Sequence, residues 1–183
     1  MAGSTSAATA LGEIAANAAS PNGAAFNSVR RDDATLVLKN GLVVACFARE
    51  AEGFGHAVVS AYSDIAKTGG IIERFEPDFL VSQTEIAART KLSRAAISLY
   101  VSGERGSGFP PPHARITSSS PLWDWVEVSS WMHKHAQLSL EEVVNARLSR
   151  AINWFVQNPL KAMKATDRDL WEIFEGAARE PFL

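Results

Sequence analysis

The residues best suited to chemistry lie in the stretch SQTEIAARTKLSRAAISLYVSG, which spans residues 82–103. If a helix begins after Ser93, the side chains of Arg94, Ala95 and Ser98 face outward from it. An arginine, a small apolar residue and a hydroxyl on the first turns of a helix can contact base edges in the major groove of DNA. This stretch therefore indicates recognition of double-stranded DNA.

Two short helices joined by a tight corner would position these side chains. Residues 82–85, Ser-Gln-Thr-Glu, have the form of a capping box and predict a helix that begins within them. Ser93 is the natural N-cap of a second helix. Ile86, Leu92 and Ile97 place one apolar residue on each helix and one in the turn. This is the minimal core of a helix-turn-helix.

The charge of the chain is uneven along the sequence. The formal net charge of −2 argues against indiscriminate coating of nucleic acid. Between Phe79 and His135, however, six basic residues face four acidic ones, whereas the rest of the chain has twelve basic and sixteen acidic residues. The modest basic excess thus coincides with the helix pair. The basic residues of this stretch are Arg89, Lys91, Arg94, Arg105, Arg115 and Lys134.

The helix pair is followed by a segment rich in Gly, Pro and Ser (residues 103–120) and then by the sequence PLWDWVEVSSWMHKH. Arg105 and Arg115 bracket the first segment, where they either contact phosphates or are ordinary loop charges. The tryptophans of the second segment could stack on the bases of a single strand. Their spacing is more typical of a core strand that runs into a helix.

In their order along the chain, TEIAARTKLSRAAISLYVSG, the Gly/Pro-rich loop and SPLWDWVEVSSWM resemble the winged helix-turn-helix of MerR-like and excisionase-like regulators. In that group the second helix reads the major groove, the Gly/Pro-rich segment forms a wing, and a Trp-containing helix packs behind. The resemblance implies a recognition helix at residues 93–101. The DNA-binding residues expected are Thr84, Lys91, Ser93, Arg94, Ala95, Ser98, Arg105 and Arg115.

Two positions depart from the pattern of that group. Lys91 stands where glycine is common, which costs about 1 kcal/mol if its φ is positive. Asp124 stands where a basic residue is frequent. Because a carboxylate repels phosphate, we expect the face that carries Asp124 not to touch DNA.

The segment before the helix pair predicts a small ββαβ unit. Thr35–Leu38 and Leu42–Phe47 are β-prone runs joined by Lys39-Asn40-Gly41, a typical hairpin turn. Phe54–Thr68 has helical apolar spacing, and Ile71–Phe75 reads as a third strand. The sequences DDATLVLKNGLVVACFARE and IIERFEPD resemble an N-terminal extension found in bacterial proteins of the same kind, so the whole resemblance covers residues 32–135.

The first 25 residues contain ten alanines, one charged residue and no aromatic residue. Such a stretch buries too little apolar surface to offset its ordering entropy, so it is expected to be largely disordered and dispensable for folding. A short helix over residues 7–19 is the alternative, because alanine has the highest helix propensity.

Two helices are expected near the C-terminus. A capping box at residues 139–142 opens a helix with an apolar stripe, and a shorter helix starts at Thr166. Large apolar side chains crowd this region, so we expect a homodimer assembled after His135. The alternative is that the last helix covers the stripe within one chain. The stripe consists of Leu140, Val144, Leu148, Ile152 and Phe155.

These patterns predict an α+β fold in four regions. They are a disordered tail at residues 1–25, the ββαβ unit at 26–77, the winged helix-turn-helix at 78–135 and C-terminal helices at 136–183. No run approaches the ~20 apolar residues of a membrane span, and no signal peptide is evident, so a cytoplasmic protein is expected.

No catalytic constellation stands out, and we expect neither enzymatic activity nor a cofactor. His133 and His135 are two residues apart, which points them to different faces of a helix, so no metal site is expected there. The leading interpretation is a sequence-specific DNA-binding protein, most simply a bacterial transcriptional regulator. An excisionase-like architectural factor and a protein-interaction adaptor with a vestigial helix-turn-helix remain alternatives.

Overall fold

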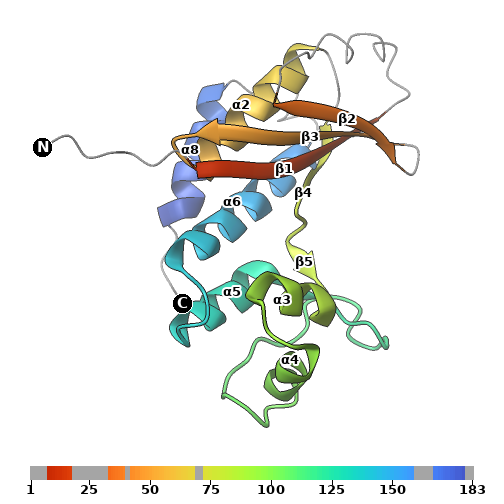
Figure 1. The fold of residues 1–183 in the computed structure, drawn as a ribbon, viewed down its shortest axis with the longest axis vertical. Helices are drawn as coiled ribbons and strands as arrows, with labels where there is room; N and C mark the ends of the chain where they lie inside the picture. The colour runs from red at the N-terminus through yellow and green to blue at the C-terminus, as the bar shows by residue number, and fades with distance from the viewer. Residues whose placement is uncertain (1–7, 18–32, 40–41, 69–71, 159–166, 180–183) are drawn as a thin grey trace, which may run out of the picture. The chain divides into compact units, whose positions relative to one another are not determined.

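The computed structural model describes residues 8–17, 33–39, 42–68, 72–158 and 167–179. The protein is α+β, and its chain forms two compact units (Figure 1). Within the described residues, the first unit runs to Pro77 and resumes from Ala151 to Arg179, and the second runs from Asp78 to Arg150. The limit after Pro77 is also a boundary in the sequence analysis. The sequence predicts that residues 136–158 belong to a separate C-terminal region. In the structure, the second limit between the units falls between Arg150 and Ala151, inside the helix Leu140–Val156, so these residues are divided between the two units.

The first unit contains a four-stranded sheet whose strands pair in antiparallel fashion (Figure 1). Its order is β2-β3-β1-β4. The predicted hairpin is confirmed, since Lys39 pairs with Leu42; residues 40 and 41 lie outside the described residues. The strands are β1 (Ala8–Asn17), β2 (Ala34–Lys39), β3 (Leu42–Ala51) and β4 (Ile72–Glu76).

The expectation of a disordered or helical N-terminal tail is wrong for residues 8–17. They form β1, a central strand whose backbone pairs with β3 along its whole length and with β4 in its second half. The physical reason is that sheet pairing satisfies backbone N–H and C=O groups whatever the side chains are. The unit is therefore βββαβ in chain order, not ββαβ. Residues 1–7 and 18–25 lie outside the described part of the chain.

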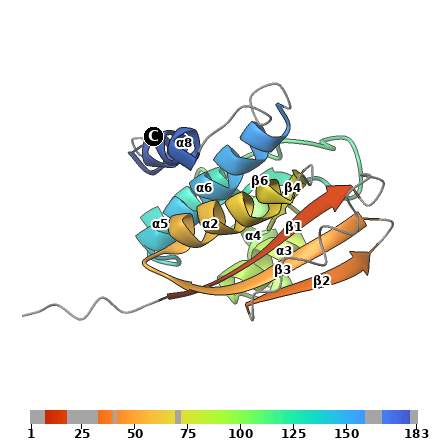
Figure 2. The ribbon, with the colours of Figure 1, turned by 90° about the horizontal axis from the view of Figure 1, so that it is seen from above.

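One helix, α2 (Phe54–Lys67), covers the sheet as predicted (Figure 2). Its buried side has the expected helical spacing, with Ile65 fully buried. The Tyr62 ring meets the Phe155 ring edge-on, with 6.0 Å between ring centroids. Burial raises the pKa of Tyr62. The remaining buried residues of α2 are Ala57, Val58, Val59, Ala61, Tyr62 and Ser63.

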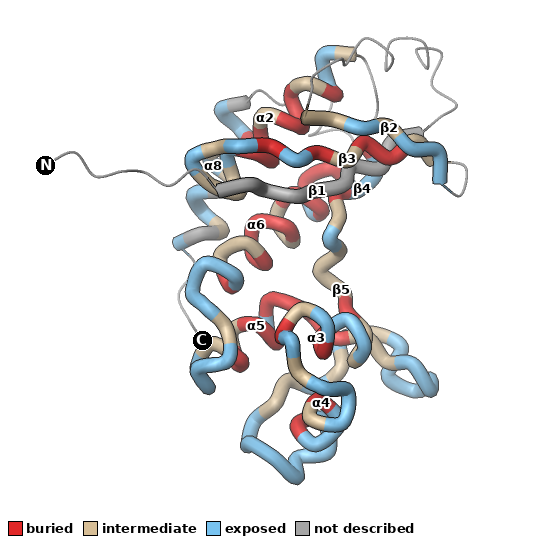
Figure 3. Tube along the Cα trace, viewed as in Figure 1, coloured by how far each residue is buried: buried red, intermediate tan, exposed pale blue. Residues whose placement is uncertain are grey.

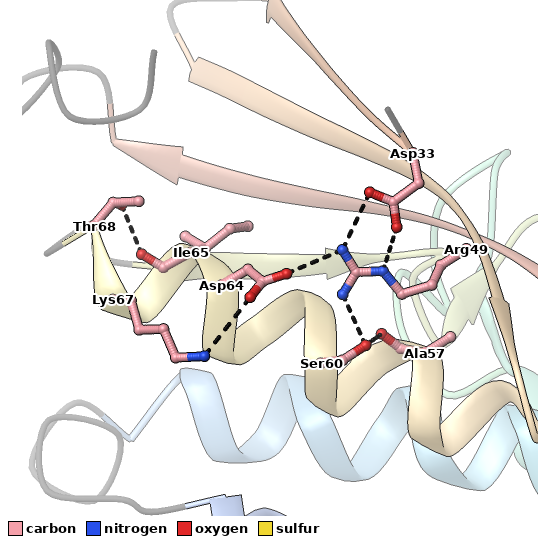
Figure 4. Close-up of polar contacts among 8 residues, drawn as sticks. All are labelled: Asp33, Arg49, Ala57, Ser60, Asp64, Ile65, Lys67 and Thr68. Carbon is pink, nitrogen blue, oxygen red and sulfur yellow. Dashed lines mark hydrogen bonds and ion pairs between the residues drawn. The ribbon is translucent and has the colours of Figure 1, made fainter. Parts of the chain in front are cut away.

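A buried arginine joins β3 to α2 (Figure 4). The Arg49 Nε donates to Asp33 Oδ2 at 2.6 Å, and its two Nη atoms donate to Ser60 Oγ at 2.8 Å and Asp64 Oδ2 at 3.0 Å. Burial acts to lower the pKa of Arg49, but the two carboxylates outweigh it and raise the pKa above its ordinary value. The guanidinium therefore stays charged and holds the helix to the sheet.

Helix α6 (Leu140–Val156) lies on both sides of the division between the units. In the first unit, its Asn153 is buried and forms two hydrogen bonds with the backbone of Phe75 in β4. Phe75 N donates to Asn153 Oδ1 and Asn153 Nδ2 donates to Phe75 O, both at 2.9 Å. The amide thus occupies the backbone groups that another strand would use.

The apolar stripe of α6 is largely covered within the chain. Leu148, Ile152 and Phe155 are buried, whereas Leu140 is 47% exposed. The last helix, α8 (Asp167–Arg179), contacts α2 and buries Leu170. The stripe therefore gives little support to a dimer, although the dimer itself remains a prediction. Thr166, the expected start of α8, lies outside the described residues.

The second unit packs three short helices, the first part of α6 and a short two-stranded sheet around a core that contains the tryptophans. Figure 3 colours the buried segments of these elements red. Strand β5 (Leu80–Val81) pairs with β6 (Trp123–Asp124), which runs directly into α5 (Trp125–Lys134). This confirms the core-strand interpretation of the tryptophans. The helix pair consists of α3 (Gln83–Thr90) and α4 (Arg94–Val101). The buried core is Val81, Ile86, Ala87, Ile97, Tyr100, Trp123, Trp125, Val126, Val128, Trp131, Met132 and Ala146.

Candidate nucleic-acid interface

The first helix of the pair begins with the predicted capping box. Ser82 Oγ accepts from the backbone N–H of Glu85 at 3.3 Å, and Glu85 Oε2 accepts from Ser82 N at 2.7 Å. Burial acts to raise the pKa of Glu85, but the hydrogen bonds from Ser82 and the charge of Arg89 outweigh it, so the pKa lies below its ordinary value. The box fixes where α3 starts and leaves Thr84 exposed in its first turn.

A left-handed residue turns the chain between the two helices. Lys91 has φ 57° and ψ 24°, so it takes up the strained conformation considered for this position. Leu92 N then donates to Ala87 O at 3.1 Å, and the Leu92 side chain packs against the core. The Lys91 side chain is exposed. The corner is therefore anchored by Leu92 and presents a positive charge.

Helix α4 has one buried face and one exposed face. Ser93 caps it, because Ser93 Oγ accepts from Ala96 N at 3.1 Å. Ile97 is fully buried and Tyr100 is 6% exposed. The opposite side of the helix exposes Arg94, Ala95, Ser98 and Leu99.

An aromatic cluster supports the back of α4. The Tyr100 ring is 5.1 Å from the Trp131 ring and 6.1 Å from the Phe109 ring, between centroids. The Trp131 Nε1 donates to Ser107 O at 3.0 Å, which ties the loop after α4 to α5. In that loop, a Cβ on Gly106 would come within 3.0 Å of the Trp131 ring, and φ at this glycine is +71°. Both α4 and this loop are thus held from behind.

Arg105 lies on the exposed side of the loop that follows α4. Its guanidinium lies 5.3 Å from the centroid of the Tyr100 ring, and its backbone N–H donates to Leu99 O at 3.0 Å. The residue is exposed despite these contacts. A cation held beside the end of α4 in this way is available to a phosphate.

The second half of the Gly/Pro-rich segment forms a closed loop. Ala114 and Leu122 exchange backbone hydrogen bonds of 3.0 and 2.9 Å, so residues 115–121 project from a fixed base. Trp123 anchors the part of the segment that precedes this loop, since its Nε1 donates to Pro110 O at 3.2 Å. Arg115, with φ 51°, is exposed at the start of the projecting part.

Asp124 is not a surface acid. It is 4% exposed and caps α5, with Oδ1 accepting from Val126 N at 2.7 Å and Oδ2 3.3 Å from Arg150 Nη1. The sequence analysis expected its charge to keep a whole face away from DNA. The physical basis of that expectation is absent, because the carboxylate is buried and is balanced by Arg150 and the N-terminus of α5.

The two histidines at the C-terminal end of α5, His133 and His135, form hydrogen bonds with backbone carbonyls. His133 Nδ1 is 2.9 Å from Leu138 O, and His135 Nδ1 is 2.8 Å from Trp131 O. The His135 ring also stacks on Trp131. Within the described part of the chain, no cluster of three or more His, Cys, Asp or Glu residues could hold a metal ion.

All eight expected DNA-binding residues are exposed. The sequence did not reveal the role of Arg89, whose Nη2 donates to Asp78 O at 3.0 Å and whose guanidinium lies 5.1 Å from the Trp125 ring centroid. Part of the local basic excess is therefore used in packing. Five of the eight lie in the turn and on α4: Lys91, Ser93, Arg94, Ala95 and Ser98.

No family model matches the chain, and no match was found among curated proteins or solved structures. Among the helices of the described residues, none is long and apolar enough to cross a membrane. The functional argument therefore depends on the residues and geometry of the second unit.

Proposed function

We propose that the protein binds double-stranded DNA in a sequence-specific manner, most simply as a bacterial transcriptional regulator. The second unit acts as a winged helix-turn-helix, with α4 in the major groove and residues 103–120 as the wing. The observation that carries the proposal is the exposed face of α4, where Arg94, Ala95 and Ser98 are unobstructed while Ile97 anchors the opposite side.

The size and charge of this surface suit the partner. An α-helix with its side chains is about 10–12 Å in diameter, and the major groove is about 12 Å wide, so α4 can enter it. Side chains on the first turn reach base edges, and Arg94 is the longest of them. Lys91, Arg105 and Arg115 can contact the phosphates on either side.

Replacing Arg94 with alanine tests the proposal. Site selection with the purified full chain first identifies a preferred duplex, and binding is then measured by fluorescence anisotropy. If Arg94 contacts a base, R94A weakens specific binding by about 1–3 kcal/mol, and R94K recovers only part of the loss because lysine lacks the planar fork.

Arg168 provides the matched control. It is an exposed arginine on α8, so R168A removes the same charge outside the second unit. R168A should bind like the wild type. A uniform loss for R94A over all sequences would make Arg94 a phosphate contact, and no loss at all would show that α4 is not the reading helix.

A protein-interaction adaptor is the second candidate. The observation that favours it is that the second unit exposes Leu99, Val101 and Ile116, which are 39%, 37% and 67% exposed. Apolar side chains of this kind can contact a protein partner. Weak binding without sequence preference, lost at about 150–200 mM salt, would favour the adaptor over the regulator.

We also propose that the protein binds DNA as a homodimer. A single helix pair covers about half a turn of DNA, and two-fold symmetry supplies the second half-site. Light scattering on the full chain tests this. Truncation before α6 is not a suitable comparison, because Ala146 belongs to the core of the second unit. A full-length monomer that binds its site tightly would exclude the dimer.

A further inference from the structure

The exposed face of α4 is unusual in its chemistry for a DNA-reading surface. Of its side chains, only Arg94 is charged, and Ala95 and Leu99 are apolar. The helix, RAAISLYV, contains neither asparagine nor glutamine. Those amides are the side chains that read adenine by a paired hydrogen bond. Arg94, Ala95, Ser98 and Leu99 therefore offer one strong hydrogen-bond donor group, one hydroxyl and two apolar contacts. Val101, also exposed, is the last residue of α4.

We propose that α4 selects its site through the methyl groups of thymine, which Ala95 and Leu99 contact, together with one guanine read by Arg94. This rests on the proposed function. In the major groove, the thymine C5-methyl is the one apolar feature that base pairs present, and small or branched apolar side chains recognise it. Arginine pairs with guanine O6 and N7.

Helix geometry relates the two methyl contacts to each other. Ala95 and Leu99 are four residues apart, so they lie on the same side of α4 with a rise of about 6 Å between them. With α4 along the groove, that rise equals roughly two base-pair steps of about 3.4 Å. The two contacted methyl groups should therefore belong to base pairs about two steps apart.

The backbone of Leu99 is held in place by the loop after α4 and by the neighbouring aromatic cluster. The Leu99 carbonyl accepts from Arg105 N at 3.0 Å, and the neighbouring Tyr100 is held in the aromatic cluster. Leu99 itself is 39% exposed, so it is accessible to a partner. Its backbone is held in place before DNA binds, which reduces the entropy lost on contact.

Replacing thymine with uracil tests the proposal, because it removes the methyl group and leaves every hydrogen-bonding group of the base in place. The full-length wild type is titrated with the selected duplex carrying uracil at one thymine at a time. At two positions, uracil should weaken binding about fourfold, as expected for one buried methyl group. Replacing a guanine with 7-deazaguanine should weaken wild-type binding at one position.

Two variants assign the methyl contacts to residues. In L99A, the uracil penalty should fall below twofold at one of the two positions and stay at the other, and A95G should show the reverse. Circular dichroism checks that the helix content of both variants is unchanged. The variant S98A, which keeps both apolar contacts, should retain both penalties.

The outcomes separate this inference from the proposed function. A selected site whose affinity does not change with uracil at any thymine, or penalties that persist in both L99A and A95G, would overturn the inference while specific DNA binding stands. Failure to select any sequence would overturn the proposed function and this inference together.

Discussion

Raising the salt concentration from about 50 to about 200 mM should weaken the DNA binding of one subunit by about 40- to 150-fold, and that of the proposed homodimer by about 2,000- to 20,000-fold. The estimate comes from the exposed basic side chains around α4, which are Lys91, Arg94, Arg105 and Arg115. Each phosphate contact adds about −0.9 to the slope of log K against log salt concentration. Four contacts per subunit give a slope of about −3.6, and three, if Arg94 is on a base, give about −2.7, so the homodimer should have a slope of about −5.4 to −7.2. Arg89 is left out because it is engaged with Asp78 and Trp125.

Anisotropy titrations at four or more salt concentrations measure the slope directly. R115A should make it shallower by about 0.9 per subunit, or about 1.8 for the homodimer, without changing which sequences are preferred, because phosphate contacts carry no base information. R168A, outside the second unit, should leave the slope unchanged. A wild-type slope steeper than about −9 would require phosphate contacts that two copies of this surface do not provide, and would refute the assignment of the interface.

Three further results are expected from unfolding measurements. R49A should lower the free energy of unfolding by about 3–5 kcal/mol, because it leaves the carboxylate of Asp64, which is 10% exposed, without its buried cation. Urea denaturation measures this, with R49K as the control that keeps the charge. Deleting residues 1–17 should destabilise the first unit strongly, since it removes β1 from between β3 and β4. Deleting residues 1–7 leaves β1 intact and serves as the control. If the two truncated proteins had equal melting temperatures, β1 would not be a central strand of the sheet. E85Q should be less stable than the wild type at neutral pH, and the difference should shrink as the pH falls below the ordinary value of 4.5, because the lowered pKa of Glu85 stabilises the folded state only while the carboxyl is ionised. A difference that stays constant with pH would show that the charge of Glu85 has no part in it.

The helix pair was predictable because its signals are local. A capping box such as Ser82–Glu85 places its donors and acceptors within one turn, so three or four residues are enough to identify it. Ser93 acts in the same way for α4. The hairpin at Lys39 and Leu42 also depends on adjacent residues. All three features were predicted correctly for this reason.

The features that were missed depend on partners far away in the sequence. An alanine-rich segment has low β propensity, and β1 is a strand because β3 and β4 flank it. The sequence alone predicts Asp124 to be a surface acid, because its partner, Arg150, lies 26 residues further on. Arg49 gave no signal at all, since Asp33 and Asp64 surround it only once α2 packs on the sheet. Side-chain contacts across such separations leave no spacing pattern.

The Asn153 amide has a consequence for the behaviour of the protein at high concentration. Strand β4 is at the edge of the sheet, and an edge is where a second chain can add a strand and start an aggregate. The two hydrogen bonds at Phe75 occupy the N–H and C=O that such a strand would need. A helix that lifts away from β4 would uncover both groups at once. Residues that hold α6 in place therefore also protect the protein against self-association, and damage to them would appear first as loss of solubility.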